Sequence, residues 1–305
     1  MNNKANIILT HNCNLRCLHC YIDAKACKEN LEKNYNKTIE LIDKLEKDNF
    51  KQIMFTGGEC LIFPKIVDLI KYAKSKDMIV SIFTNGMIFN QEVLDLVDMV
   101  NISVDGPDNI HNYIRQNENS YNNIIKVLDY LKIIDKYTTL QMTINNFNYD
   151  NLDYLVDLTL SHLNVRTVKI AGVINDGRAK ENSIYLDKEM LEKVYNKIDD
   201  LYEMTKYHIQ FVTSLYNNYD FENYCLNEKM MFPIWFDIPN EKYYLLNDKL
   251  STNYDLNKYE FKNIKNDNLL YKNILKENKE TIEREDYIDI EKSLFELMGE
   301  NKNEE

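Results

Sequence analysis

The chain has 305 residues, of which 44% are hydrophobic, so it can bury the core of one large domain or of one domain with an appendage. Its net charge of -12 argues against a nucleic-acid partner, because a phosphate backbone needs clustered cations, and favours a small molecule or a basic peptide. No segment approaches the roughly 20 apolar residues of a membrane span, and Ile7 to Leu9 is too short for a signal peptide, so we expect a cytoplasmic protein without a membrane partner.

The first predicted strand, residues 6–10, leads into the stretch LTHNCNLRCLHCYIDA at positions 9–24. Cys13, Cys17 and Cys20 stand there in the spacing Cys-x3-Cys-x2-Cys. In a reducing compartment, clustered cysteines are more often metal ligands or catalysts than disulfides. Zinc and closed iron-sulfur sites both need a fourth ligand, whereas three thiolates on a 4Fe-4S cluster leave one iron open to chelation by a ligand.

Short apolar, β-branched segments then alternate with helical patterns. Further strands are predicted over residues 52–56, 79–85, 100–105, 139–145 and 167–176, and helices over 63–76, 90–99, 121–137 and 151–163. Strands that alternate with helices imply a parallel sheet. About six strand-helix units over residues 1–206 predict an α/β fold, a partial (βα)6 TIM-like barrel.

Glycines and polar residues cluster where these strands end, and in such barrels the chemistry lies at that edge. Six of the seven glycines follow the apolar runs, and the other, Gly299, is near the C-terminus. The turns read FTGGEC (55–60), FTNGM (83–87), ISVDGPDNIHNYIR (102–115), MTIN (142–145) and NDGRAK (175–180). Each turn taken alone could be an ordinary strand-to-helix connection.

Taken together, the three cysteines and the turns resemble the radical S-adenosylmethionine (radical SAM) superfamily. The resemblance implies a 4Fe-4S cluster held by Cys13, Cys17 and Cys20, with S-adenosylmethionine on its open iron. It also implies that reductive cleavage of S-adenosylmethionine yields a 5'-deoxyadenosyl radical, which takes a hydrogen atom from the substrate. The implied contacts to S-adenosylmethionine are Gly57, Gly58, Glu59, Thr84, Asn85, Ser103, Asp105, Arg115 and Asn145.

Histidines and arginines in these turns leave alternatives open. His19 is interpreted as shielding the cluster rather than binding metal, and His111 with Arg115 as fixing the loop after the fourth strand. Arg115 or Arg178 could instead pair with a carboxylate of the cofactor or of the substrate, because a guanidinium binds carboxylates through two hydrogen bonds.

The chain changes character at about residue 207, which predicts a smaller C-terminal α+β extension over 207–305. A hairpin is expected within 230–250 and a charged helix at 289–299, before an acidic tail. The signature at 102–115 resembles the peptide-maturing branch with the cysteine-rich SPASM extension. Here only Cys225 follows residue 206, so the extension is degenerate and cannot hold auxiliary clusters of about four ligands each.

Three functions remain open. The first is a radical enzyme that modifies a ribosomally made peptide, supplied with electrons by a donor such as flavodoxin or ferredoxin. The second is a radical enzyme acting on a small metabolite, and the third is a non-catalytic binding protein on a decayed barrel. Within the first, Cys225 or Cys60 could quench a substrate radical by donating a hydrogen atom, which would make the protein a peptide epimerase. Cys60 could equally fill the turn as a small hydrophobic residue.

Overall fold

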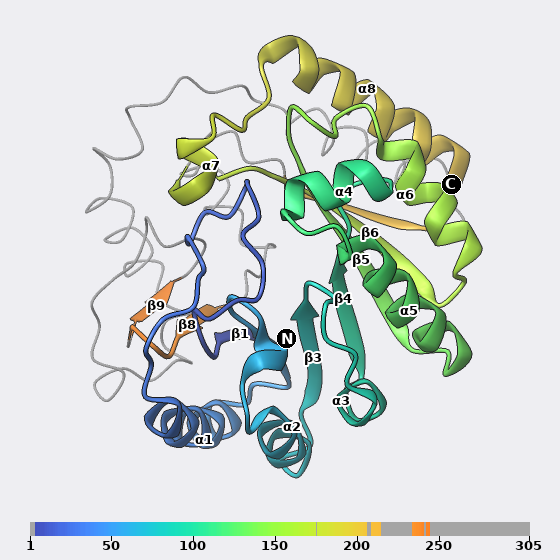
Figure 1. Ribbon diagram of the computed structural model, residues 1–305. Helices are drawn as coiled ribbons and strands as arrows, with labels where there is room; N and C mark the ends of the chain where they lie inside the picture. The colour runs from blue at the N-terminus through green and yellow to red at the C-terminus, as the bar shows by residue number, and fades with distance from the viewer. Residues whose placement is uncertain (1–3, 175, 206–208, 215–233, 241, 245–305) are drawn as a thin grey trace, which may run out of the picture.

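A curved, unclosed sheet with helices on its outer face forms the body of the computed structural model (Figure 1). The structure describes residues 4–174, 176–205, 209–214, 234–240 and 242–244. Six parallel strands lie side by side in chain order, which confirms the predicted α/β partial barrel. They are β1 (Lys4–Ile8), β2 (Gln52–Thr56), β3 (Ile79–Thr84), β4 (Met99–Ser103), β5 (Tyr137–Ile144) and β6 (Val165–Gly172).

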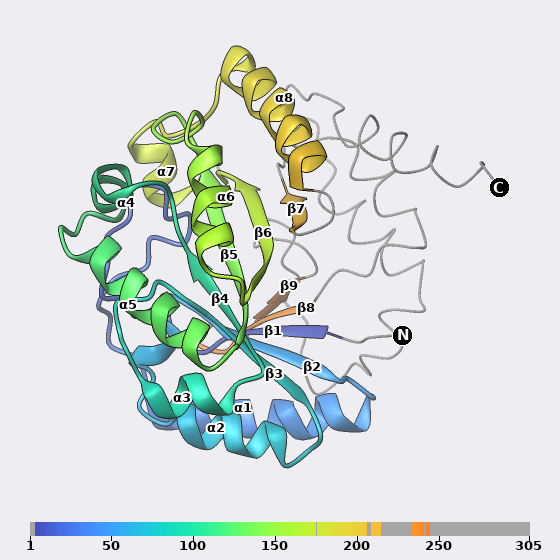
Figure 2. The same cartoon turned by 90° about the vertical axis from the view of Figure 1, so that its right-hand side faces the viewer.

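Helices connect these strands, and the longer ones cover the convex face of the sheet (Figures 1 and 2). The helices are α1 (Leu31–Lys47), the short 3-10 helix η1 (Cys60–Ile62), α2 (Ile66–Lys74), α3 (Gln91–Leu96), α4 (Asp108–Arg115), α5 (Ser120–Ile133), α6 (Leu152–Ser161), α7 (Gly177–Glu181) and α8 (Lys188–Thr205). Asparagine side chains begin two of them: Asn30 accepts a hydrogen bond from the Lys33 N–H and Asn90 from the Val93 N–H. No helix in the described part of the chain has both the length and the apolar character needed to cross a membrane.

Two predicted helices are shorter than expected. The pattern over 121–137 predicts a helix to Tyr137, but α5 ends at Ile133 and Tyr137 begins β5. The pattern over 90–99 predicts a helix to Met99, but α3 ends at Leu96 because Val97 takes an extended conformation. The Asp98 N–H then donates to the Val80 carbonyl oxygen at 2.8 Å, so the chain has already turned into the sheet. Apolar periodicity alone does not separate the last turn of a helix from the first residues of a buried strand.

Alternate strand residues face the helices. Ala5 and Ile7 of β1 belong to the buried hydrophobic core, as do Val80 and Ile82 of β3. Because successive strand residues point to opposite faces of a sheet, the residues between them line the concave face. In β1 those residues include Lys4 and Asn6.

Three strands from beyond residue 206 join the same sheet. β7 (Gln210–Ser214) pairs with β6, β8 (Ile234–Asp237) pairs in parallel with β1, and β9 (Lys242–Tyr244) pairs antiparallel with β8. The predicted hairpin within 230–250 is therefore confirmed, and it extends the barrel sheet beside β1. The domain boundary at 206 stays a prediction. The predicted helix at 289–299 and Cys225 lie outside the described residues.

Candidate active site

The loop after β1 carries the three predicted cluster ligands at the carboxyl edge of the sheet. Each of their sulfur atoms accepts a hydrogen bond from an N–H group. The donors are the Leu15 amide to Cys13 at 3.4 Å, the Ala24 amide to Cys20 at 3.3 Å and the Arg115 Nη1 to Cys17 at 3.7 Å. Hydrogen bonds to cysteine sulfur are among the means by which proteins tune iron-sulfur clusters, so this donor set fits a cluster with three thiolate ligands.

Burial affects the ionisation of these thiols. It raises the pKa of Cys13 and raises that of Cys17 to about 11, so without a metal both sulfurs keep their protons at neutral pH. Cys13 and Cys17 must therefore release these protons when they bind a metal. Among the described residues, no three His, Cys, Asp or Glu side chains gather closely enough for a single ion.

The turn after β2 rests directly on this loop. The Gly58 and Glu59 N–H groups donate to the carbonyl oxygens of Thr10 and Asn12 at 2.8 and 2.9 Å. A Cβ atom added to Gly57 would lie 2.3 Å from the Thr10 carbonyl oxygen, and one on Gly58 would lie 2.4 Å from that of Asn12. Only glycine fits such a close approach, so this turn fixes the start of the cysteine loop.

Glu59 joins the ends of β2 and β3. Its buried carboxylate accepts hydrogen bonds from the Thr84 hydroxyl at 2.9 Å and the Asn85 N–H at 2.8 Å. Burial raises the pKa of Glu59, while these hydrogen bonds oppose that effect. The Asn85 side-chain amide in turn donates to the Asn14 side-chain oxygen at 2.8 Å, within the cysteine loop. The structure thus brings the predicted site residues Glu59, Thr84 and Asn85 together. Their contact with S-adenosylmethionine stays a prediction.

Behind Cys17 lies a buried ionic network. Asp105 is fully buried, and its Oδ2 accepts hydrogen bonds from Arg115 Nε at 2.6 Å and pairs with His19 Nε2 at 3.0 Å. Its Oδ1 accepts the Thr143 N–H at 3.1 Å. Burial alone would raise the pKa of Asp105, but the Arg115 guanidinium and His19 hold it well below its usual range. The Asp105 side chain therefore stays ionised, and Arg115 bridges its carboxylate and the Cys17 sulfur.

His111 completes this network as a neutral ring. Its Nδ1 accepts the Asp105 N–H at 3.0 Å, and its Nε2 lies 2.9 Å from the Ser120 hydroxyl. Burial and the nearby Arg115 charge lower the pKa of His111 to about 3. His111 and Arg115 thus hold the loop after β4, as the sequence predicts.

Two further predicted residues lie at this edge. Ser103 is the last residue of β4 and is buried. Asn145 is fully buried in the turn after β5, where its side chain accepts the Phe147 N–H and donates to the Thr143 carbonyl oxygen. Contacts of Ser103, Asp105, Arg115 and Asn145 with a cofactor stay predictions.

Arg178 supports the cysteine loop from the opposite side. Its backbone N–H donates to the Cys20 carbonyl oxygen at 3.0 Å, its Nε to the Cys17 carbonyl oxygen at 2.9 Å, and its Nη1 to Asp23 at 2.6 Å. The preceding Gly177 has a φ of +50°, and a Cβ there would lie 2.5 Å from the Tyr21 carbonyl oxygen. The sequence suggested a carboxylate of the cofactor or of the substrate as the partner of Arg178, whereas the structure shows contacts with Asp23 and with the carbonyl oxygens of the loop. The Gly-Arg pair in the predicted turn NDGRAK was the available signal.

Cys60 is completely buried in the hydrophobic core, and its thiol donates to the Phe83 carbonyl oxygen at 3.4 Å. Burial raises its pKa well above the usual value. This placement favours the packing role over hydrogen-atom donation to a substrate. The other predicted donor, Cys225, lies outside the described residues.

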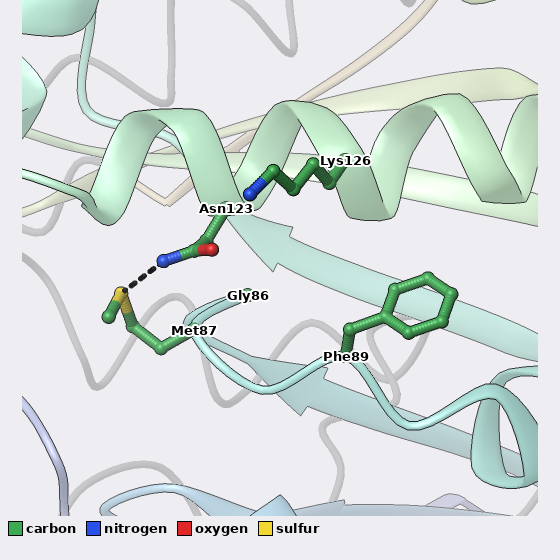
Figure 3. Close-up of a pocket in the computed structure, with 5 residues that line it drawn as sticks. All are labelled: Gly86, Met87, Phe89, Asn123 and Lys126. Atoms are coloured by element: carbon green, nitrogen blue, oxygen red, sulfur yellow. Dashed lines mark hydrogen bonds between the residues drawn. The ribbon is translucent and has the colours of Figure 1, made fainter.

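A cavity of about 300 Å³ opens between the turn after β3 and α5 (Figure 3). Gly86, Met87, Phe89, Asn123 and Lys126 line it, and the Asn123 amide points at the Met87 sulfur at 3.7 Å. None of the cysteines and none of the predicted cofactor contacts lines this cavity, so it is separate from the candidate site.

Comparison with known proteins agrees with this arrangement. The family model described as "Radical SAM superfamily" matches residues 7–159. The sporulation killing factor maturation protein SkfB of Bacillus subtilis is 28% identical over 192 residues, which cover 61% of this chain and 46% of that protein. The GTP 3',8-cyclase of Chlorobaculum tepidum is 31% identical over 173 residues, 54% of this chain and 52% of that protein. The chain thus spans about half the length of these curated relatives.

Among solved structures, Streptococcus suis SuiB bound to its precursor peptide SuiA superposes with a TM-score of 0.68. The match covers 90% of this chain and 66% of SuiB at 13% sequence identity. At that identity the likeness shows a shared fold.

Proposed function

This chain belongs to the radical SAM superfamily, and we propose that within it the protein takes a hydrogen atom from a ribosomally made peptide and so modifies that peptide. The observation that carries the proposal is the turn after β4. The signature residues Asp105, His111 and Arg115 form one buried network that reaches Cys17. The similarity to SkfB, a maturation protein, and the fold shared with SuiB, which was solved with a precursor peptide, support a peptide substrate.

The family's cofactors are a 4Fe-4S cluster and S-adenosylmethionine, which when bound supply the one-electron cleavage that makes hydrogen abstraction possible. In this chain Cys13, Cys17 and Cys20 would hold the cluster. Arg115 would keep a positive charge beside Cys17, and Arg178 would hold the loop in place through the Cys17 and Cys20 carbonyl oxygens. We propose that a donor such as flavodoxin or ferredoxin supplies the electrons.

The turn that contains Glu59 would bind the amino group of S-adenosylmethionine. In the structure the Glu59 carboxylate orders the backbone of Asn85 and the hydroxyl of Thr84, at the ends of two adjacent strands. The carbonyl oxygens of a glycine pair beside the cysteine loop are suitable acceptors for an ammonium group. The concave face of the sheet would then receive the substrate away from bulk water.

A small metabolite is the second candidate substrate. One relative is named a GTP 3',8-cyclase, and only Cys225 follows residue 206, too few cysteines for auxiliary clusters. A non-catalytic binding protein is the third candidate. The intact cysteine set and the intact Gly57–Glu59 turn speak against it.

Epimerisation is one form that the peptide modification can take, and it rests on Cys225. After a hydrogen atom has left the α-carbon of a residue, the Cys225 thiol would return one to the opposite face. The sulfur radical left behind would need one electron from the external donor and one proton from solvent. Turnover in heavy water would place one solvent deuterium in each product. A product free of deuterium, or undiminished D-residue in Cys225→Ala, would contradict the role of Cys225.

The test of the proposed function uses anaerobically reconstituted protein with S-adenosylmethionine and dithionite. We expect iron and sulfide in the ratio of one 4Fe-4S cluster, formation of 5'-deoxyadenosine, and a mass change in a short peptide encoded beside the gene. Replacing the three cysteines together by Ala should abolish all three results. Cleavage of S-adenosylmethionine that leaves every such peptide unchanged but alters a nucleotide or another metabolite would favour the second candidate.

A further inference from the structure

Two lysines lie on the concave face of the sheet, in strands that are not adjacent. Lys4 opens β1 and Lys169 lies in the middle of β6. Both alternate with residues of the hydrophobic core: Ala5 follows Lys4, and Val168 and Ile170 flank Lys169. Because strand residues alternate between faces, both ammonium groups project away from the helices and toward the interior of the barrel. Both side chains are half-buried.

Neither lysine has an acidic partner in the described part of the chain. Two acidic residues at the carboxyl edge of the sheet are already paired with cationic groups, Asp105 with Arg115 and Asp237 with His11. Burial lowers the pKa of both lysines, and the charge of Lys4 lowers that of Lys169 further. The two ammonium groups are therefore within electrostatic reach of each other. Although the chain has 49 acidic and 37 basic residues, no acidic side chain of the described segments compensates these two cations.

A third observation points to a ligand at the same place. Asn6 shares the concave face of β1 with Lys4 and is 2% exposed. Its side-chain Oδ1 is buried and accepts no hydrogen bond from any residue that the structure describes. A buried acceptor of this kind normally has a partner, because leaving it unpaired costs free energy.

From these three residues we infer that the substrate peptide carries a carboxylate that binds between Lys4 and Lys169, and an N–H group that donates to Asn6 Oδ1. This inference deepens the proposed function and rests on it. Lys4 begins β1, whose other end leads to Cys13, so the carboxylate lies deeper in the barrel than the cysteine loop. The negative overall charge favours a basic peptide, but the charge that faces the substrate is positive, and at short range the local charge decides. The carboxylate is supplied either by an Asp or Glu side chain or by the C-terminus of the peptide.

The test measures which peptides the protein retains. Anaerobically reconstituted protein is immobilised and exposed to a pool of short random peptides, half of them with an amidated C-terminus, and the retained peptides are sequenced by mass spectrometry. We expect enrichment of Asp and Glu, or of free C-termini over amidated ones, and this difference identifies the source of the carboxylate. The double variant K4M/K169M should lose the enrichment by roughly tenfold or more, since a charge-assisted hydrogen bond contributes about 1.5 to 3 kcal/mol. K4R/K169R should keep part of it.

The control is Lys51→Met, which removes an exposed lysine directly before the neighbouring strand β2. It should leave the peptide preference unchanged. Because K4M/K169M removes two half-buried charges that have no acidic partner among the described residues, its melting temperature should equal or exceed that of the wild type. Enrichment of Lys and Arg, no retention of any peptide, an unchanged preference in K4M/K169M, or a large fall in its melting temperature would each overturn the inference. Formation of 5'-deoxyadenosine by the same protein preparations, supplied with S-adenosylmethionine and dithionite, tests the proposed function separately.

Discussion

Two glycines at the candidate site differ in how closely neighbouring backbone atoms approach them. Gly57 and Gly106 both have positive φ angles, +149° and +138°, that favour glycine. They differ in what a Cβ atom would meet. At Gly57 it would lie 2.3 Å from the Thr10 carbonyl oxygen, whereas at Gly106 it would lie 3.2 Å from a methyl group of Ile110 that can move. The sequence placed both glycines at strand ends, but the approach to the Thr10 backbone depends on the pairing of β1 with β2.

Gly57→Ala should therefore affect the site more than Gly106→Ala does. Both variants should lose about 1 to 3 kcal/mol of unfolding free energy from backbone strain, measured by urea denaturation. Only Gly57→Ala should also lower the iron content, because it displaces the loop that carries Cys13. Equal iron contents in the two variants would contradict the close approach.

The pair of Asp105 and Arg115 should stabilise the protein strongly. Asp105→Asn leaves the Arg115 guanidinium buried without its counter-charge, which should cost about 3 to 5 kcal/mol of unfolding free energy. The matched control is Asp135→Asn, because Asp135 and Arg166 form an exposed pair at 3.6 Å that should contribute less than about 1 kcal/mol. Similar losses in both variants, measured by urea denaturation, would show that Asp105 is not a buried ion-pair partner.

His111 should make stability depend on pH. Its pKa falls from the usual 6.5 to about 3 in the folded protein, so between these values the unfolded chain binds more protons. With respect to His111, the unfolding free energy is therefore highest above pH 6.5, and it decreases as the pH falls toward 3. Wild-type unfolding free energy should rise from about pH 5 to pH 6.5, and His111→Gln should reduce that slope by up to about 1.4 kcal/mol per pH unit. Parallel pH curves for the two proteins would contradict a neutral, buried His111.

At the scale of elements, the six strands and the helices between them follow from sequence periodicity. Residues 52–56 were predicted and form β2 without a shift, and the other strands agree within a few residues. The contacts between turns could not be predicted in this way. The Thr143 N–H of β5 donates to Asp105 after β4, and Arg178 reaches back to Cys17, because the sheet brings the ends of its strands together.

Helix α7 should hold the cysteine loop through Arg178. Arg178→Met removes the side-chain hydrogen bonds to the Cys17 carbonyl oxygen and Asp23. We expect a severalfold faster loss of iron to a chelator under anaerobic conditions, with only a small change in unfolding free energy. Arg166→Met, which changes an exposed arginine of β6, is the control and should lose iron at the wild-type rate. Equal rates in both variants would show that α7 does not hold the loop.

At the scale of the whole molecule, the sheet extends beyond the predicted barrel at both edges. β7 lies beside β6, and β8 with β9 lies beside β1. The hairpin was predicted from its local pattern, but its place was not, since strand partners far apart in the sequence leave no signal in periodicity. Lys4 and Lys169 were missed for a similar reason. Their alternation with core residues was readable, but the absence of acidic partners in the described part appears only once the strands are assembled.

The central claim is that the radical chemistry of this protein acts on a peptide. The most direct measurement uses a short peptide encoded beside the gene, deuterated at its carbon atoms, in an anaerobic reaction with S-adenosylmethionine and dithionite. Mass spectrometry of the 5'-deoxyadenosine product should show deuterium taken from the peptide. The variant with Cys13, Cys17 and Cys20 replaced by Ala should form no product. Formation of 5'-deoxyadenosine without deuterium for every such peptide, while a small metabolite is consumed, would contradict the claim.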